Sequence, residues 1–66
     1  MVKFIEVTDL NNYPVLINIE DISIIYKDKM DEENTYISFR SGANLIVKES
    51  IKTLSVRIGV DNEWYG

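Results

Sequence analysis

Turn-forming residues interrupt this sequence at short intervals, and the runs between them are rich in Val, Ile, Tyr and Phe. Clusters of Asn, Asp, Ser or Gly occupy residues 9–12, 28–34, 41–44 and 61–63. Short apolar runs bounded by such clusters are typical of β-strands joined by turns, because β-branched and aromatic side chains fit a pleated surface. The pattern therefore predicts a mainly β fold.

Five runs fit this description. The predicted strands cover residues 2–8, 13–19, 22–27, 35–40 and 45–48. The first two are expected to form a hairpin around Asn11 and Asn12, since Asn tolerates left-handed backbone angles. A tight or 3₁₀ turn is expected at residues 18–21, and Gly42 suits a turn that needs a positive φ.

Alternation with period 2 assigns the side chains of these strands to two faces. In the third strand, Ile22, Ile24 and Tyr26 are expected on one face, opposite Ile25. In the fourth strand the alternation separates an inward set from an outward set. The inward set is Thr35, Ile37 and Phe39, and the outward set is Tyr36, Ser38 and Arg40.

The C-terminal stretch fits two different periods. Ile51, Leu54 and Ile58 share one face at helical spacing, and Ser50 is a suitable helix N-cap. The competing pattern is a strict alternation of Leu54, Val56, Ile58 and Val60. Because four positions match period 2 and three match period 3.6, we expect one helical turn over residues 49–53 and then a short sixth strand. A continuous helix is the alternative.

The length of 66 residues limits the architecture. Five or six short strands in one small domain of residues 1–66 favour a strongly curved antiparallel sheet or a partly open barrel of the SH3-like or Sm-like kind. The chain has no Cys, so no disulfide can stabilise so small a core. We therefore expect a homo-oligomer, in which edge strands of different copies pair.

The composition excludes several kinds of chemistry. Without Cys or His, the chain has no thiol nucleophile, no thiolate zinc site and no imidazole base. No Ser lies in a Gly-x-Ser-x-Gly elbow, and the acidic run of residues 31–33 lacks the spacing of a calcium-binding loop. We expect no enzymatic activity, no cofactor and no metal.

The charge balance bears on nucleic-acid binding. Seven Lys and Arg against eleven Asp and Glu give a net charge of -4, which argues against strong binding to a phosphate backbone. Small barrels can nevertheless bind single strands through aromatic and basic side chains. The best candidate patch is Tyr36, Arg40 and Arg57. A single-stranded nucleic-acid binder of Sm-like architecture is therefore the alternative function.

Two large aromatic residues, Trp64 and Tyr65, lie near the end of the sequence. Such residues are enriched at interfaces. Their segment either folds back over the open end of the barrel or inserts into a neighbouring subunit or a partner protein, and both alternatives stand. Together with Val56 and Ile58 they form the candidate interface of a non-catalytic module that self-associates and presents a surface to an unidentified protein partner.

The N-terminal segment does not match a signal peptide, because Glu6 interrupts its apolar run. No apolar run approaches the roughly 20 residues needed to cross a bilayer. We expect a cytoplasmic protein without membrane insertion.

Several short motifs resemble those of a known family. Residues 5–12, Ile-Glu-Val-Thr-Asp-Leu-Asn-Asn, are similar to the strand and Thr-x-Leu-Asn-Gly turn that open small flagellar proteins of the FlbD type, with Asn12 where that family usually has Gly. Residues 16–18 and 21–22 resemble the second strand and the turn after it. Gly42 and the Val-Lys-Glu-Ser motif of residues 47–50 resemble the later turn and strand end. The resemblance implies a small cytoplasmic accessory protein linked to motility, without catalytic chemistry.

Overall fold

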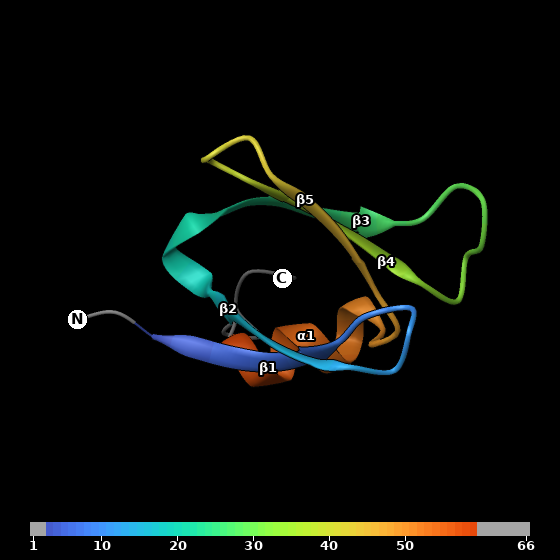
Figure 1. Ribbon diagram of the computed structural model, residues 1–66, viewed down its shortest axis with the longest axis horizontal. Coiled ribbons are helices and arrows are strands. Elements are labelled where there is room, and N and C mark those ends of the chain that lie inside the picture. The colour runs from blue at the N-terminus through green and yellow to red at the C-terminus, as the bar shows by residue number, and fades with distance from the viewer. Residues whose placement is uncertain (1–2, 60–66) are drawn as a thin grey trace, which may run out of the picture.

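A computed structural model of the chain describes residues 3–59, which form two antiparallel β-sheets and one α-helix (Figure 1). The strands are β1 (Phe4–Thr8), β2 (Pro14–Asn18), β3 (Ile22–Lys27), β4 (Thr35–Phe39) and β5 (Asn44–Val47). β1 pairs with β2, and the three-stranded sheet has the order β3-β4-β5. A 3₁₀ turn, η1 (Ile19–Asp21), leads from β2 into β3, and α1 (Ile51–Ile58) follows β5. The prediction of a mainly β fold is confirmed.

The β1–β2 hairpin closes through the predicted Asn-rich turn. Asn12 has a left-handed φ of 68°. The Asp9 side chain accepts hydrogen bonds from the backbone N–H groups of Asn11 and Tyr13, at 2.9 and 3.0 Å. An Asp side chain that binds backbone N–H groups further along the chain in this way stabilises a turn. The local chemistry of the sequence is therefore sufficient to form this hairpin.

The core lies between the two sheets and the helix. Its six buried apolar side chains are Ile5, Val7, Ile17, Ile37, Val47 and Leu54. Thr35 is also buried, and its hydroxyl donates a hydrogen bond to the Glu49 carbonyl at 2.6 Å. The inward orientation predicted for Thr35 and Ile37 is confirmed.

Within residues 3–59, direct strand-to-strand hydrogen bonding between the two sheets occurs where the end of β1 meets the end of β5. The Lys48 N–H donates to the Thr8 carbonyl at 2.9 Å, and Asp9 forms an isolated bridge with Val47. Beyond this bridge the hairpin separates from β5, so the five described strands do not close into a barrel. In Figure 1 the hairpin and the three-stranded sheet lie on opposite sides of the molecule.

A β-bulge changes the predicted faces of β3. Ile22 and Ile24 pair with successive residues of β4, so Ser23 is an extra residue in the strand. An extra residue shifts the alternation counted along the sequence by one position, so Ile24 lies on the face opposite to Ile22. Ile24 and Tyr26 are therefore exposed, whereas Ile22 and Ile25 pack against the core. The prediction that Ile22, Ile24 and Tyr26 share one face was wrong for this reason.

Residues 51–58 form one continuous helix, and the predicted sixth strand is wrong. The Ser50 hydroxyl accepts a hydrogen bond from the Thr53 N–H at 3.1 Å and caps the first turn. At the other end, Gly59 has a φ of 86° and donates its N–H to carbonyls of the last turn. Leu54 is only 1% exposed. Two caps and a buried helical face outweigh the alternation of β-branched residues, so the continuous-helix alternative is confirmed.

Candidate functional site

The outer face of the three-stranded sheet carries neighbouring apolar side chains. The bulge turns Ile24 and Tyr26 outward, and strand pairing places Tyr36 opposite Tyr26 and Ile46 opposite Tyr36. The rings of the two tyrosines stack, with centroids 4.9 Å apart and planes inclined by 29°. We call this surface, made of Ile24, Tyr26, Tyr36 and Ile46, the aromatic face.

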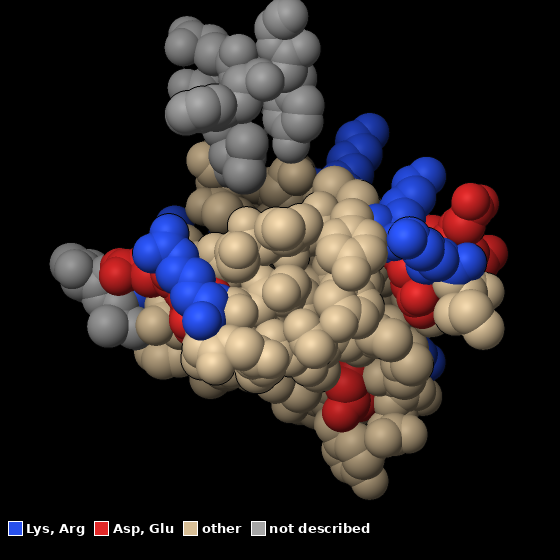
Figure 2. Space-filling model, turned by 90° about the horizontal axis from the view of Figure 1, so that it is seen from above, with Lys and Arg blue, Asp and Glu red and all other residues tan. Residues whose placement is uncertain are grey.

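The aromatic face is uncharged and partly exposed, with Tyr36 and Ile46 half-buried. Ile24 is 56% exposed and Tyr26 is 40% exposed. Figure 2 views the molecule from the side of this sheet and shows a continuous uncharged surface, with Lys, Arg, Asp and Glu at its margins. Because large apolar patches rimmed by polar residues are often interaction sites, the aromatic face is a candidate interaction surface.

A notch of about 420 Å³ opens at the edge of the aromatic face. It forms because the hairpin pairs with β5 only at the Asp9–Val47 bridge and then separates from it. Its lining residues come from the hairpin turn, β4 and β5: Asp9, Leu10, Asn11, Tyr36, Asn44, Leu45 and Ile46. Since Tyr36 and Ile46 belong to both, the notch and the aromatic face are continuous.

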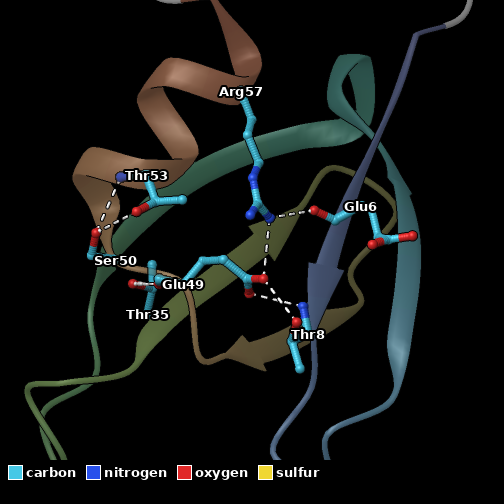
Figure 3. Close-up of polar contacts among 7 residues, drawn as sticks. All are labelled: Glu6, Thr8, Thr35, Glu49, Ser50, Thr53 and Arg57. Atoms are coloured by element: carbon cyan, nitrogen blue, oxygen red, sulfur yellow. Dashed lines mark hydrogen bonds and ion pairs between the residues drawn. The ribbon is translucent and has the colours of Figure 1, made fainter.

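A polar cluster lies where β1, β5 and α1 meet (Figure 3). The Glu49 carboxylate accepts hydrogen bonds from the Thr8 N–H at 2.8 Å and from the Thr8 hydroxyl at 2.9 Å. It also forms an ion pair with Arg57 at 3.1 Å, and the same Arg57 nitrogen donates to the Glu6 carbonyl at 2.7 Å. We call Glu6, Thr8, Glu49 and Arg57 the Glu49 cluster. It ties the helix and the end of β5 to the first strand.

Two opposing effects act on the pKa of Glu49. Burial raises the pKa, since the side chain is only 11% exposed, but hydrogen bonds from Thr8, from its own backbone N–H and from Arg57 lower it. The hydrogen bonds prevail and hold the pKa of Glu49 below its ordinary value. Glu49 is therefore an ionised carboxylate with both oxygens engaged, which suits a structural link better than a catalytic base.

The structure separates the residues of the predicted nucleic-acid patch. Tyr36 stacks on Tyr26 on the aromatic face, whereas Arg57 extends from α1 toward Glu49 (Figure 3). Arg40 follows β4 and is exposed. Among residues 3–59, no hydrogen bond, ion pair or ring contact connects Tyr36, Arg40 and Arg57 with one another.

The predicted interface residues also lie apart. Val56 is 76% exposed, whereas Ile58 packs against the core. Residues two positions apart in a helix differ by roughly 200° in direction, so the helix places them on different sides, where a strand would align them. Trp64 and Tyr65 lie outside the described residues, as do Val2 and Val60, the ends of two predicted strands.

Sequence reasoning missed most residues of the aromatic face and notch, including the apolar residues Leu10, Ile24 and Ile46. Ile24 was assigned together with Ile22 because a bulge leaves no mark in an alternating pattern. Leu10 and Ile46 meet at the notch although they are far apart in the sequence. The one available signal was the predicted outward orientation of Tyr36, the residue that joins the aromatic face to the notch.

The acidic side chains and the helix bear on metal binding and on membrane insertion. Between residues 3 and 59, no group of three or more acidic side chains is arranged to hold a metal ion. In the acidic loop, the Asp31 carboxylate accepts hydrogen bonds from the Glu33 N–H at 3.1 Å and the Asn34 amide at 3.4 Å, which closes a local turn. Over the same residues, the structure contains no helix with the length and apolar character that a membrane span requires.

Comparison of the chain with protein-family models, with curated proteins and with solved structures gives no match. Within residues 3–59, the aromatic face and the notch lie on the surface, whereas the Glu49 cluster links elements inside the fold.

Proposed function

We propose that this chain is a non-catalytic protein-interaction module that self-associates through its aromatic face. The observation that carries the proposal is the uncharged outer surface formed by the exposed Ile24 and Tyr26 and the half-buried Tyr36 and Ile46, on the side of the molecule seen in Figure 2. Removing apolar surface from water contributes about 25 cal/mol per Å². Charges at the margins stay hydrated, as in the polar rim of a protein interface.

A second copy of the chain fits this face well. A twofold axis brings the same patch of two copies together, so that uncharged surface meets uncharged surface. Both signs of charge lie at the margins in Figure 2, which allows opposite charges to meet at the rim. A separate partner protein has another surface, because Phe4 and Leu16 on the hairpin are 55% and 66% exposed.

The architecture supports a relation to small, partly open barrels of the SH3-like or Sm-like kind. Through the bridge between Asp9 and Val47, the strands follow one another in the order β2-β1-β5-β4-β3. The left-handed Asn12 occupies the turn position where FlbD-type proteins usually have Gly, which fits the same turn geometry. On this basis we infer a cytoplasmic accessory role of the FlbD type, in which binding replaces catalysis.

Sedimentation equilibrium of matched variants tests self-association. Ile24→Asp places a charge in the aromatic face and should weaken self-association by at least about tenfold, since burying an unpaired charge costs several kcal/mol. Leu16→Asp, on the outer face of the hairpin, is the control and should leave the association constant unchanged. A wild-type protein that remains monomeric at high micromolar concentration would contradict the proposal.

One observation favours the alternative of single-stranded nucleic-acid binding. The stacked pair of Tyr26 and Tyr36 on an exposed sheet is a surface on which bases can stack. Retention on an oligonucleotide column that falls with increasing salt, and is lost in Tyr36→Ala, would support this alternative. The net charge of -4 and the ion pair between Arg57 and Glu49 favour protein association instead.

A further inference from the structure

The notch presents backbone groups as well as side chains. The Lys48 N–H points away from β4 and donates to the Thr8 carbonyl. Successive backbone N–H groups of an antiparallel strand point to opposite edges of that strand. The N–H groups of Asn44 and Ile46 therefore point to the same edge of β5 as the N–H of Lys48. Between the bridge and the β4–β5 turn, this edge of β5 faces the notch, where an extended segment can add a strand.

The side chains around this edge suit a large aromatic residue. Leu10, Tyr36 and Ile46 form apolar walls, and Leu10 is 46% exposed. A volume of about 420 Å³ is within the range of sites that hold a small organic group. The ring of Tyr36 offers a stacking partner to an aromatic side chain.

Lys48, just after β5, offers a charged partner to an acidic residue beside the notch, which Asp9 also lines. Lys48 is exposed directly after β5, and its ammonium group donates to the Asn12 side chain at 2.5 Å. Asp9 lies nearby, but its carboxylate already accepts hydrogen bonds from two backbone N–H groups of the turn, at 2.9 and 3.0 Å. A ligand carboxylate next to Lys48 would therefore be favoured.

This chain itself contains a segment with the required chemistry. Residues 60–66 read Val-Asp-Asn-Glu-Trp-Tyr-Gly. Two carboxylates, Asp61 and Glu63, directly precede the aromatic pair Trp64 and Tyr65. The segment thus combines negative charge with the aromatic side chains that the notch accommodates.

The direction of α1 determines which copy can supply this segment. The helix runs back along β1, because Glu49 contacts Thr8 whereas Gly59 lies beside the Lys3 side chain. The notch lies beyond Thr8, roughly 20 Å from Lys3 at 3.3 Å per residue. The chain from Gly59 to Trp64 spans at most roughly 18 Å when fully extended. A segment that leaves Gly59 would therefore have to turn back along α1 and be almost fully extended to bring Trp64 to the notch of its own copy, whereas the notch of a second copy imposes no such requirement.

We propose that the notch binds the Trp64-Tyr65 pair of a second copy, with residues 60–66 added to the edge of β5 as an extended strand. This inference rests on the self-association proposed above and names the segment that the copies exchange. Reciprocal exchange about a twofold axis fills both notches and closes a dimer. Of the two alternatives left by the sequence, insertion into a neighbouring subunit is the one this geometry favours.

Trp64 is the only tryptophan of the chain, so its fluorescence reports on this segment directly. We expect emission shifted to the blue at high protein concentration and to the red on dilution, in parallel with the fall in mass measured by sedimentation. Leu10→Ser removes an apolar wall of the notch, so it should weaken the dimer at least about tenfold and shift the Trp64 emission to the red. Trp64→Ala should weaken the dimer to a similar extent. Because this variant has no tryptophan, its dimer is followed by sedimentation only. Leu16→Ser is the matched control and should change neither signal.

Mass and emission together distinguish the two proposals. A stable dimer in which Trp64 emits as if in water would overturn the exchange of residues 60–66 and leave self-association standing. A monomer at every concentration would overturn both. If that monomer emits in the blue, the segment docks on its own copy instead.

Discussion

The Glu49 cluster and the aromatic face use their side chains in opposite ways. In the cluster, a carboxylate and a guanidinium lie at the junction of three elements, and their hydrogen bonds are made within the chain. On the aromatic face, Ile24 and Tyr26 are exposed to solvent, and Tyr26 stacks on the half-buried Tyr36. A charged pair therefore adds to the links made by the apolar core, while some residues typical of a core lie on the surface. In so small a protein, position decides the role of a side chain more than its type does.

Removing the Glu49 side chain should have the largest effect on stability. Glu49→Ala leaves the N–H and hydroxyl of Thr8 without an acceptor at a half-buried site, and we expect a loss of about 1–3 kcal/mol in the free energy of unfolding. Chemical denaturation followed by circular dichroism measures this loss. Glu32→Ala, in the exposed loop, is the control and should stay within about 0.5 kcal/mol of the wild type. Equal losses would contradict a stabilising role for the cluster.

The pH dependence of the free energy of unfolding distinguishes the contribution of the Glu49 charge from that of its side-chain packing. Because its folded pKa is lowered, its charge contributes fully above the unfolded value, near 4.5, and the contribution is lost as the pH falls through the folded pKa. The stability difference between the wild type and Glu49→Gln should therefore be largest at neutral pH and shrink in acid. Urea denaturation over a pH series measures the difference. A constant difference from about pH 7 to about pH 3 would count against this account.

Arg57→Ala should be milder than Glu49→Ala, because the Arg57 side chain is 43% exposed and solvent weakens its ion pair. We expect a loss below about 1 kcal/mol, measured by thermal or chemical unfolding. Lys52→Ala, an exposed position on the same helix, is the control. The double variant of Glu49 and Arg57 should lose less than the sum of the single losses, since the pair is shared. Strict additivity would show that the two side chains do not interact.

The stacked tyrosines should contribute least to the stability of the single copy. A double-mutant cycle of Tyr26→Ala and Tyr36→Ala should give a coupling of about 0.2–1 kcal/mol, typical of a cross-strand pair. The cycle is measured at a protein concentration low enough to keep the chain monomeric. Tyr13 and Tyr26 form the control pair, with no expected coupling. If the coupling energy between Tyr26 and Tyr36 exceeded that between Glu49 and Arg57, the aromatic face would stabilise the single copy more than the Glu49 cluster does, contrary to this account.

Local features were predictable from the sequence. The hairpin turn followed from the tolerance of Asn for left-handed angles, and Asn12 adopts such an angle. The inward orientation of Thr35 and Ile37 followed from alternation in a regular strand. In each case the determining residues are neighbours in the chain, so their pattern contains the information.

Features that depend on distant residues were not predictable. Thr8 and Glu49 are 41 positions apart, and neither residue type indicates the other as its partner. The notch likewise requires the hairpin turn to lie beside β5. In the C-terminal stretch, the burial of Leu54 and the caps at Ser50 and Gly59 decided between two periods that the sequence satisfies almost equally.

In a regular strand, one added residue moves every later side chain to the other face of the sheet. Ser23, the extra residue in β3, lengthens the strand without this effect. Ile22 and Ile24 already oppose adjacent positions of β4. Deleting Ser23 would therefore leave a regular β3–β4 ladder with Tyr26 still on the solvent side. The deletion would reduce the local twist of the strand, because a bulge increases that twist. Evolution can thus tune the curvature of this sheet by gaining or losing a single serine, without moving any other side chain across it.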